Sequence, residues 1–112
     1  MTTATRDKLL ASIEEAFGLN KTELGRVFGV SRQAIDSWHE SGVPGARQEK
    51  AAAVAAIGDL LGRQLKSERI PGIARRPAPA YGGRTMLEMI EQDRHLELLA
   101  IVRASFDWSN TA

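Results

Sequence analysis

The segment from residue 31 to residue 40 is rich in side chains that form paired hydrogen bonds. Arg32 can donate two parallel bonds to guanine or clamp a phosphate, and Gln33 can pair with adenine through one donor and one acceptor. Asp36 can accept a bond from cytosine, or it can orient Arg32 or Arg26. If this segment is a helix facing a DNA groove, its outward residues are Ser31, Arg32, Gln33, Asp36, Ser37 and Glu40.

Two short helices and a tight turn are expected to position these side chains. Asn20 followed by Glu23 resembles a capping box, which would open the first helix. Gly29 can end that helix, because glycine adopts positive φ without steric cost. Ser31 can then cap the second helix, so the pattern predicts helix, turn and helix in close succession.

The stretch KTELGRVFGVSRQAIDSWHE, residues 21–40, resembles the helix-turn-helix of the Xre and phage-repressor type along its whole length. This motif needs a small residue inside its first helix and a residue of positive φ in its turn, which Gly25 and Gly29 provide. It also needs apolar residues where the helices meet: Leu24, Phe28, Val30, Ile35 and Trp38. An ordinary helical hairpin does not require all of these features together, so the sequence predicts a DNA-binding motif.

The resemblance implies that double-stranded DNA is the ligand. It also implies that Lys21, Thr22 and the start of the first motif helix lie against the sugar-phosphate backbone, with Arg47 as a further contact. Arg26, Ser31 and Ser37 complete the predicted DNA-binding set. For Lys21, Glu40 and Arg47, an ordinary solvated charge is the alternative interpretation.

The composition argues against catalysis and metal binding. A chain of 112 residues has a core only a few helices deep, which does not favour a cleft built from several loops. The absence of cysteine excludes disulfides, thiolate zinc sites and cysteine nucleophiles. His39 and His95 have no carboxylate set at ligand spacing, and no nucleophile accompanies the Asp36–His39 pair. We therefore expect no enzyme activity, no cofactor and no metal.

The formal net charge of +1 does not by itself suggest DNA, so that prediction depends on the positions of particular residues. No stretch approaches the roughly 18 consecutive apolar residues that span a bilayer, and the N-terminus lacks the apolar run of a signal peptide. Together with the absence of cysteine, these features predict a cytoplasmic protein with no membrane partner.

Helical periodicity dominates the sequence and predicts an all-α fold, with a DNA-binding domain at 1–66 and a C-terminal region at 67–112. The expected helices lie at about 5–17, 21–28, 31–40, 46–66, 85–92 and 94–106. The 46–66 helix carries a stripe of small residues, Ala51, Ala55, Gly58 and Gly62, which indicates close approach by another element. Tight packing within the monomer is the favoured reason, and a dimer contact is the alternative.

Residues 69–84 contain three of the four prolines, so we expect no regular helix through them. Thr85 and Glu88 form a capping-box pair that opens the next short helix. The last helix is apolar over most of its circumference, which indicates that two surfaces cover it. One of these surfaces can belong to a partner.

The run PAPAYGGRTMLEMIEQDRHLELLAIVRASFDWS resembles the toxin-binding domain of bacterial antitoxins of the Xre, MbcA and ParS type. The residues that match its Gly-Gly-Arg-Thr-Pro-Leu turn are Gly82, Gly83, Arg84, Thr85 and Leu87. Met86 replaces the usual proline, and Gln92 with Asp93 replaces the glycine that commonly follows the short helix.

This resemblance implies a dimer that represses its own promoter and blocks a toxin of the NAD-consuming RES type through its C-terminal region. Arg84, Phe106 and Trp108 are the residues predicted to contact the toxin, since aromatic side chains are effective anchors in pockets. The alternative is that Phe106 and Trp108 fold back on the body of the protein.

We predict a homodimer formed mainly by residues after about Leu65, with contacts at Leu98, Ile101 and Val102. Two-fold pairing would extend the DNA site by about one helical turn. The predicted function is therefore that of an autoregulatory antitoxin. A stand-alone repressor of phage or plasmid type is one alternative. A protein-interaction adaptor with a vestigial motif is another, and it predicts no salt-sensitive DNA binding.

Overall fold

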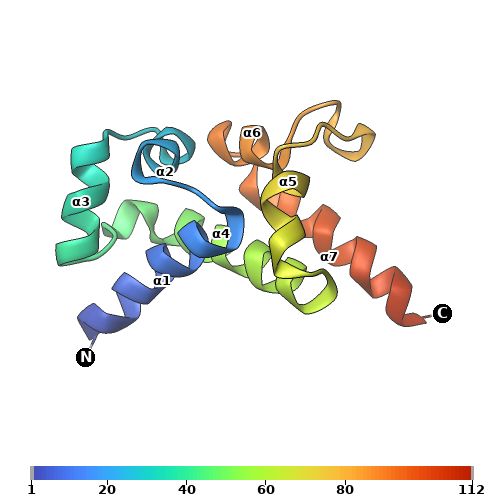
Figure 1. Cartoon of the computed structure of the whole chain (residues 1–112), viewed down its shortest axis with the longest axis horizontal. Coiled ribbons are helices and arrows are strands. Elements are labelled where there is room, and N and C mark those ends of the chain that lie inside the picture. Colours follow the sequence, from blue (N-terminus) through green and yellow to red (C-terminus); the bar gives the residue numbers. More distant parts are fainter. Residues whose placement is uncertain (1, 112) are drawn as a thin grey trace.

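The computed structural model describes the backbone of residues 2–111 and the side chains of residues 8–106. All regular elements in this part of the chain are helices, which confirms the predicted fold class (Figure 1). The α-helices are α1 (Thr2–Phe17), α2 (Lys21–Phe28), α3 (Arg32–Ser41), α4 (Gly45–Gln64), α5 (Ile70–Ala74), α6 (Met86–Glu91) and α7 (His95–Thr111). Two 3₁₀ helices, η1 (Ser67–Arg69) and η2 (Pro79–Tyr81), lie between α4 and α6. None of the described helices is long and apolar enough to cross a membrane.

The molecule is elongated, with principal extents of 43 × 29 × 26 Å. Helix α3 stands at one end of the longest axis, and α7 points toward the other end (Figure 1). Helix α4 runs through the middle and packs against both α1 and α7. This arrangement leaves the outer side of α3 clear of the rest of the fold.

The close approach predicted from the small residues of α4 occurs inside the monomer. Gly58 is buried, and a Cβ atom on it would lie 3.0 Å from Ala16 Cβ and 3.4 Å from the Phe17 ring. A larger residue at position 58 would therefore push α1 away from α4. Gly62, one turn further along α4, has open space where its Cβ would be.

The connection at residues 69–84 contains short helices that the sequence did not predict. Helix α5 has Pro71 in its first turn, where the missing N–H needs no partner. Ile70 and Ala74 of this helix are buried in the core. The prolines thus limit helix length as expected, but one of them starts a helix.

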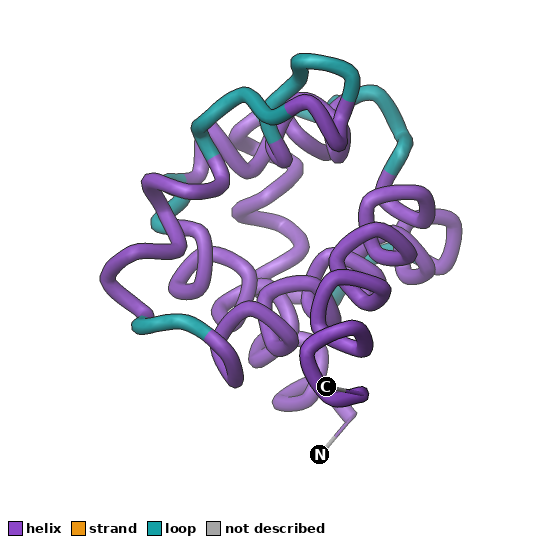
Figure 2. Tube along the Cα trace, turned by 90° about the vertical axis from the view of Figure 1, so that its right-hand side faces the viewer, coloured by secondary structure: helices purple, strands orange, loops and turns teal. Residues whose placement is uncertain are grey.

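One hydrophobic core joins the two predicted regions. Its buried side chains extend from Leu10 in α1 through Ile57 in α4 to Leu98 and Val102 in α7. Figure 2 shows the helices gathered into one body, with the connecting loops at its periphery. The boundary predicted at residue 66 therefore does not separate two cores.

A salt bridge ties α4 to the turn between α6 and α7. The Lys50 side chain is only 7% exposed, and its Nζ donates to Asp93 Oδ1 at 2.8 Å. The same Nζ lies 5.4 Å from the centre of the Phe28 ring, at the end of α2. Asp93 has a φ of 60°, a left-handed conformation that aspartate tolerates better than most residues. Asp93 therefore supplies both the backbone conformation for which glycine is usual and a partner for a buried cation.

Candidate nucleic-acid interface

The turn between α2 and α3 depends on two glycines. A Cβ atom on Gly25 would lie 2.7 Å from the carbonyl oxygen of Val30, so a larger residue would collide with the backbone. Gly29 has a φ of 68°, and its N–H donates to Arg26 O at 3.1 Å. Both glycine predictions are confirmed. Gly25 must be small because the turn itself, and not the second helix, approaches it.

Side-chain caps begin both helices of the motif. Asn20 Oδ1 accepts from the Glu23 N–H at 2.8 Å, and Glu23 Oε1 accepts from the Asn20 N–H at 3.1 Å. The hydrogen bond from the Asn20 N–H to the Glu23 carboxylate is the main cause that lowers the pKa of Glu23. Ser31 Oγ accepts from the Ala34 N–H at 3.1 Å. The predicted capping box and the predicted serine cap are both confirmed.

The buried sides of α2 and α3 meet as the motif predicts. Leu24 and Ile35 are fully buried, and Trp38 is 6% exposed. The rings of Phe28 and Trp38 form a T-shaped pair with centres 5.6 Å apart. Val30 is only half-buried. Because these contacts lock the two helices together, the outer face of α3 has a fixed orientation relative to α2.

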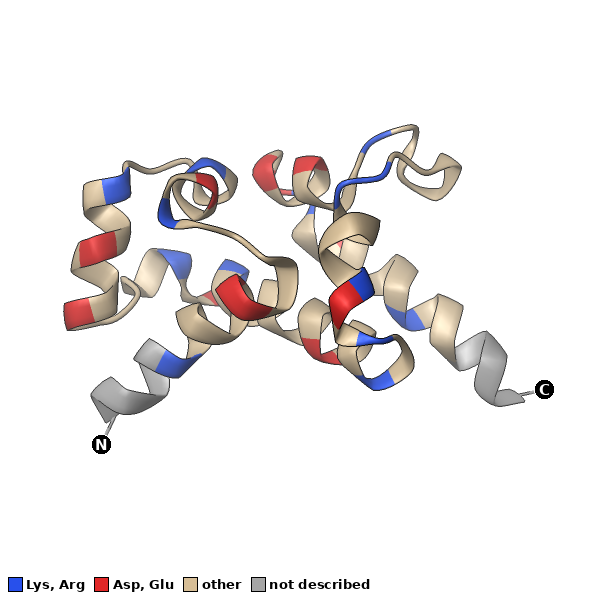
Figure 3. Ribbon diagram, in the orientation of Figure 1, with Lys and Arg blue, Asp and Glu red and all other residues tan. Residues whose placement is uncertain are grey.

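The outer side of α3 is polar and open to solvent. Its exposed residues are Ser31, Arg32, Gln33, Ser37 and Glu40. Within residues 8–106, the side chains of Arg32 and Gln33 form no hydrogen bond. Figure 3 shows a cationic residue at the start of α3 and acidic residues further along it. The base-reading side chains predicted from the sequence are therefore available to a ligand at the N-terminal end of the helix.

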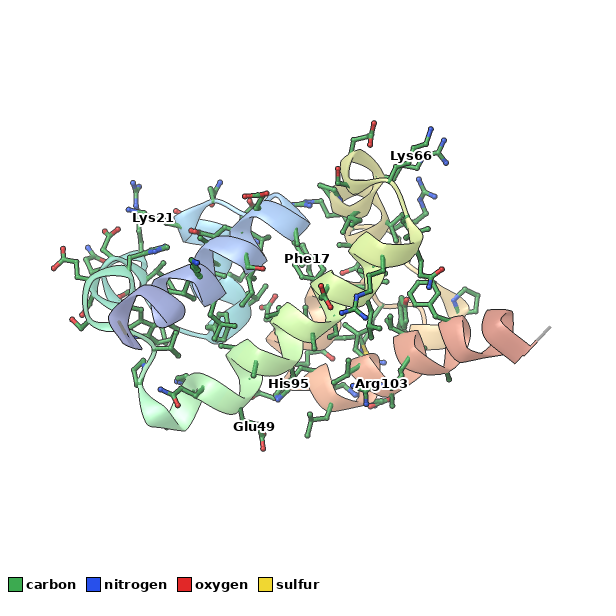
Figure 4. The ribbon with its side chains drawn as sticks, turned by 90° about the horizontal axis from the view of Figure 1, so that it is seen from below. Phe17, Lys21, Glu49, Lys66, His95 and Arg103 are labelled. Carbon is green, nitrogen blue, oxygen red and sulfur yellow. The ribbon has the colours of Figure 1, made fainter. Side chains whose placement is uncertain are left out.

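Asp36 is paired with Lys21, and not with either of the arginines that the sequence suggested. Lys21 Nζ donates to Asp36 Oδ1, and the two side chains are 44% and 46% exposed. The hydrogen bond from Lys21 lowers the pKa of Asp36. Figure 4 shows Lys21 extending from the start of α2 on the side of α3. The pair therefore fixes a cation beside the outer face of α3.

The other predicted phosphate contacts differ in their freedom to reach a ligand. Thr22 and Arg26 are exposed on α2. Arg47 is half-buried, and its Nη1 donates to the carbonyl oxygen of Phe28 at 2.8 Å. Arg47 thus satisfies one of the last carbonyl groups of α2, which have no partner within the helix. The phosphate contact of Arg47 stays a prediction, with one of its guanidinium nitrogens engaged by α2.

Two sets of contacts that the sequence did not predict join segments that are far apart in the chain. His39 Nε2 lies 3.3 Å from Glu14 Oε2 and joins α3 to α1. Arg75, just after α5, donates to Phe17 O at 2.8 Å and to Gly18 O at 3.0 Å. These partners are 25 and 57–58 positions apart in the sequence, so no local pattern indicates them.

The turn before α6 uses positive φ at both of its glycines, Gly82 and Gly83. Thr85 Oγ1 accepts from the Glu88 N–H at 3.0 Å, and Glu88 Oε1 accepts from the Thr85 N–H at 2.8 Å, which confirms the second capping box. Arg84 is half-buried, and its Nε donates to Gln92 Oε1 at 2.8 Å. Its Nη1 also donates to Tyr81 O at 3.4 Å, so the predicted toxin contact at Arg84 has two nitrogens engaged inside the chain.

Helix α7 covers most of its apolar side within the monomer. Leu98 is fully buried and Val102 is 3% exposed, while Ile101 and Phe106 are half-buried against the same core. A second copy cannot reach Leu98 or Val102 in this conformation, so these predicted dimer contacts need correction. Phe106 folds back on the body of the protein. Trp108 lies outside the residues whose side chains are described.

His95 is buried at the start of α7, beside α4 (Figure 4). Its Nδ1 has no hydrogen-bond partner, and burial is the main cause that lowers its pKa. Burial therefore favours the neutral form of the imidazole, which packs as part of the core. Among the residues that the structure describes, no group of three or more histidine or acidic residues could hold a metal ion.

A comparison with solved structures finds the same fold in a chain of the crystal structure of the M. tuberculosis MbcT-MbcA toxin-antitoxin complex. The TM-score is 0.71, and the match covers 88% of the present chain and 90% of that chain. The two sequences are 18% identical, so the likeness establishes a shared fold. No protein-family model and no curated protein matches the sequence.

Proposed function

We propose that the chain is an antitoxin that binds DNA, represses its own promoter and neutralises a partner toxin. The observation that carries this proposal is the shared fold, over nearly the whole chain, with a component of a toxin-antitoxin complex. The exposed polar face of α3 supports the DNA-binding part. The proposal includes no catalytic activity.

In the proposed DNA complex, α3 lies in the major groove. Arg32 and Gln33 stand in the first turn of α3, the part of a recognition helix that contacts base edges. Lys21 and Thr22 begin α2, where free backbone N–H groups and the helix dipole favour a phosphate. Asp36 holds Lys21 beside the α3 face, so a phosphate there would meet a cation that is already oriented.

The proposed toxin contact lies in the C-terminal region. The sequence resemblance points to a toxin of the RES type, with Arg84, Trp108 and the exposed part of the half-buried Phe106 as contact residues. Arg84 donates from Nε to Gln92 and from Nη1 to Tyr81 O, but a guanidinium has five N–H donors, and those of Nη2 remain for a carboxylate or carbonyl of the partner. Leu96 is 54% exposed and adds apolar surface on α7, the helix that carries Phe106.

We also propose that the antitoxin acts as a homodimer. A single recognition helix contacts only a short half-site, whereas two-fold pairing places two recognition helices on successive turns of the duplex. This would raise operator affinity without any new base contact.

Fluorescence anisotropy with a labelled duplex from upstream of the gene tests the DNA-binding part. We expect specific binding that weakens with salt, because phosphate contacts release counterions. Arg32→Ala and Gln33→Ala should each lower affinity by roughly 1–3 kcal/mol, as the loss of a base contact does. Arg103→Ala and Gln64→Ala are matched controls at exposed positions away from α3. Wild-type affinity in the α3 variants would remove these residues from the interface.

Co-expression with the product of the neighbouring reading frame tests the antitoxin part. We expect the two proteins to co-purify, and we expect the antitoxin to restore growth of cells in which that product is toxic. Salt-sensitive operator binding without any toxin partner would instead identify a stand-alone repressor. Toxin binding without DNA binding would identify an adaptor.

A further inference from the structure

The first helix carries an exposed face whose side chains form no hydrogen bond or ion pair within residues 8–106. Lys8, Ala11, Ser12 and Glu15 are all exposed, and their spacing of three, four and seven positions puts them on one side of α1. The opposite side of the helix is buried through Leu10, Ile13 and Phe17. The exposed side, which we call the α1 face, therefore has small residues at its centre and one charge at each end.

A groove of about 630 Å³ runs along the α1 face. Its other wall is the C-terminal half of α4 with the start of the following connection. Gly62 lines the groove with open space at its missing Cβ, and the Asp59–Arg63 pair, 2.9 Å apart, lies beside it. The remaining lining residues are Ala16, Gly58, Ser67 and Ile70. The groove is therefore shallow, lined largely by small residues and balanced in charge.

The charges of the α1 face are complementary to those of an inverted copy of the same face. Its midpoint falls between Ala11 and Ser12, and Lys8 and Glu15 lie equally far from this point on opposite sides. In an antiparallel pair of α1 helices, Lys8 of each copy would meet Glu15 of the other. Ala11 would meet Ser12 at the centre, where small side chains allow the backbones to approach closely.

We propose that the α1 face and the adjoining groove form the homodimer interface, with the two α1 helices antiparallel about a two-fold axis. This inference depends on the homodimer in the proposed function and assigns it to a surface other than α7. A two-fold contact must be complementary to itself, and the order of charges on α1 meets that requirement. On α7, Leu98 and Val102 are already buried by the monomer.

A charge-reversal series measured by sedimentation equilibrium tests this interface. Lys8→Glu and Glu15→Lys should each raise the dimer dissociation constant by about tenfold or more at low salt, because each replaces two attractive pairs with two repulsive ones. An equimolar mixture of the two variants should form a heterodimer of nearly wild-type affinity, since both pairs become attractive again. The double variant Lys8→Glu/Glu15→Lys should also self-associate like the wild type.

Controls separate the interface from folding and from the α7 alternative. Ala11→Trp should block close approach and give a monomer with the wild-type helical content, whereas Ala80→Trp, at an exposed position in η2, should leave the dimer intact. Arg103→Glu on α7 and Glu49→Lys on α4 carry the same charge changes and should have no effect on association.

Three results would overturn the interface. The first is a wild-type dimer that Ala11→Trp leaves unchanged, and the second is a mixture of the two single variants that stays monomeric. The third is a dimer that dissociates only with Arg103→Glu, which would place the contact on α7. A wild type that is monomeric at all concentrations would refute the homodimer as well. DNA and toxin binding are measured independently of all these results.

Discussion

Helices α3 and α7 stand at opposite ends of the molecule and expose different chemistry. The outer side of α3 is polar, and its Arg32 and Gln33 form no hydrogen bond within residues 8–106. Helix α7 is richer in leucine, isoleucine and valine, yet Leu98 and Val102 are buried in the monomer, and Ile101 is half-buried. A polar helix thus remains free for a ligand, while an apolar helix is largely covered by its own chain.

For α7, the apolar sequence pattern overstates the surface that is left for a partner, because the monomer buries Leu98 and Val102. Apolar side chains are buried by whichever surface is nearest, and here α4 lies in the middle of the fold. Exposed polar side chains are hydrated and common on protein surfaces, so their meaning depends on position, and Arg32 and Gln33 stand in the first turn of α3. The free side of α3 is therefore the stronger indication of function.

The largest expected change in stability distinguishes two leucines of α7, one buried and one exposed. Leu98→Asp should destabilise the fold by about 5 kcal/mol or more, since it removes a buried leucine and buries a charge. Leu96→Asp, at a residue that is 54% exposed, should change stability by no more than about 1 kcal/mol. Urea denaturation measures both. A Leu98→Asp variant that is stable, folded and monomeric would instead support the prediction that Leu98 is a dimer contact.

On α3, a substitution on the buried side should cost much more stability than one on the outer side. Trp38→Ala should cost about 3–5 kcal/mol, because it removes a buried aromatic side chain and its T-shaped contact with Phe28. Ser37→Ala, on the exposed side of the same helix, should be close to neutral. Thermal melting followed by circular dichroism compares the two. Equal melting temperatures would mean that Trp38 does not anchor the motif.

The salt bridge between Lys50 in α4 and Asp93 in the turn before α7 should contribute less to stability. Asp93→Gly keeps the left-handed backbone but removes the partner of the buried Lys50, which should cost about 1–3 kcal/mol. Asp93→Asn retains an acceptor and should cost less. If Asp93→Gly is as stable as the wild type, the Lys50–Asp93 pair does not stabilise the packing of α4 against the α6–α7 turn.

The same pair predicts a dependence on pH. The hydrogen bond from Lys50 lowers the pKa of Asp93 below its ordinary value of 3.8. The stabilisation is therefore fully present above that value and is lost as the pH falls through the lower value of the folded protein. Acid titration of the unfolding free energy should show a shallower loss in Asp93→Gly than in the wild type. Identical acid limbs would contradict this assignment.

Features that depend on a few neighbouring residues could be predicted from the sequence. The two capping boxes and the glycine turn of the helix-turn-helix belong to this class, because each is fixed by side-chain and backbone chemistry within about one helical turn. The all-α class followed in the same way from periodicity. These local features were enough to identify the polar side of α3.

Features that depend on distant residues could not be predicted. Lys50 and Asp93 are 43 positions apart, and the sequence contains no signal that joins them. Burial of Leu98 depends on where α4 lies in three dimensions, which helical periodicity alone does not specify. The partner of Arg47 could not be predicted for the same reason, since it is the Phe28 carbonyl at the end of another helix.

The most direct test of the account is a separation of its two functions in one strain. Cells carrying the neighbouring toxin gene and a reporter fused to the antitoxin promoter would express either the wild-type chain or the Arg32→Ala/Gln33→Ala variant at equal levels. The variant should lose repression of the reporter but still protect growth, because the substituted side chains lie on the free side of α3 and outside the core. Loss of both properties, or of neither, would contradict this prediction.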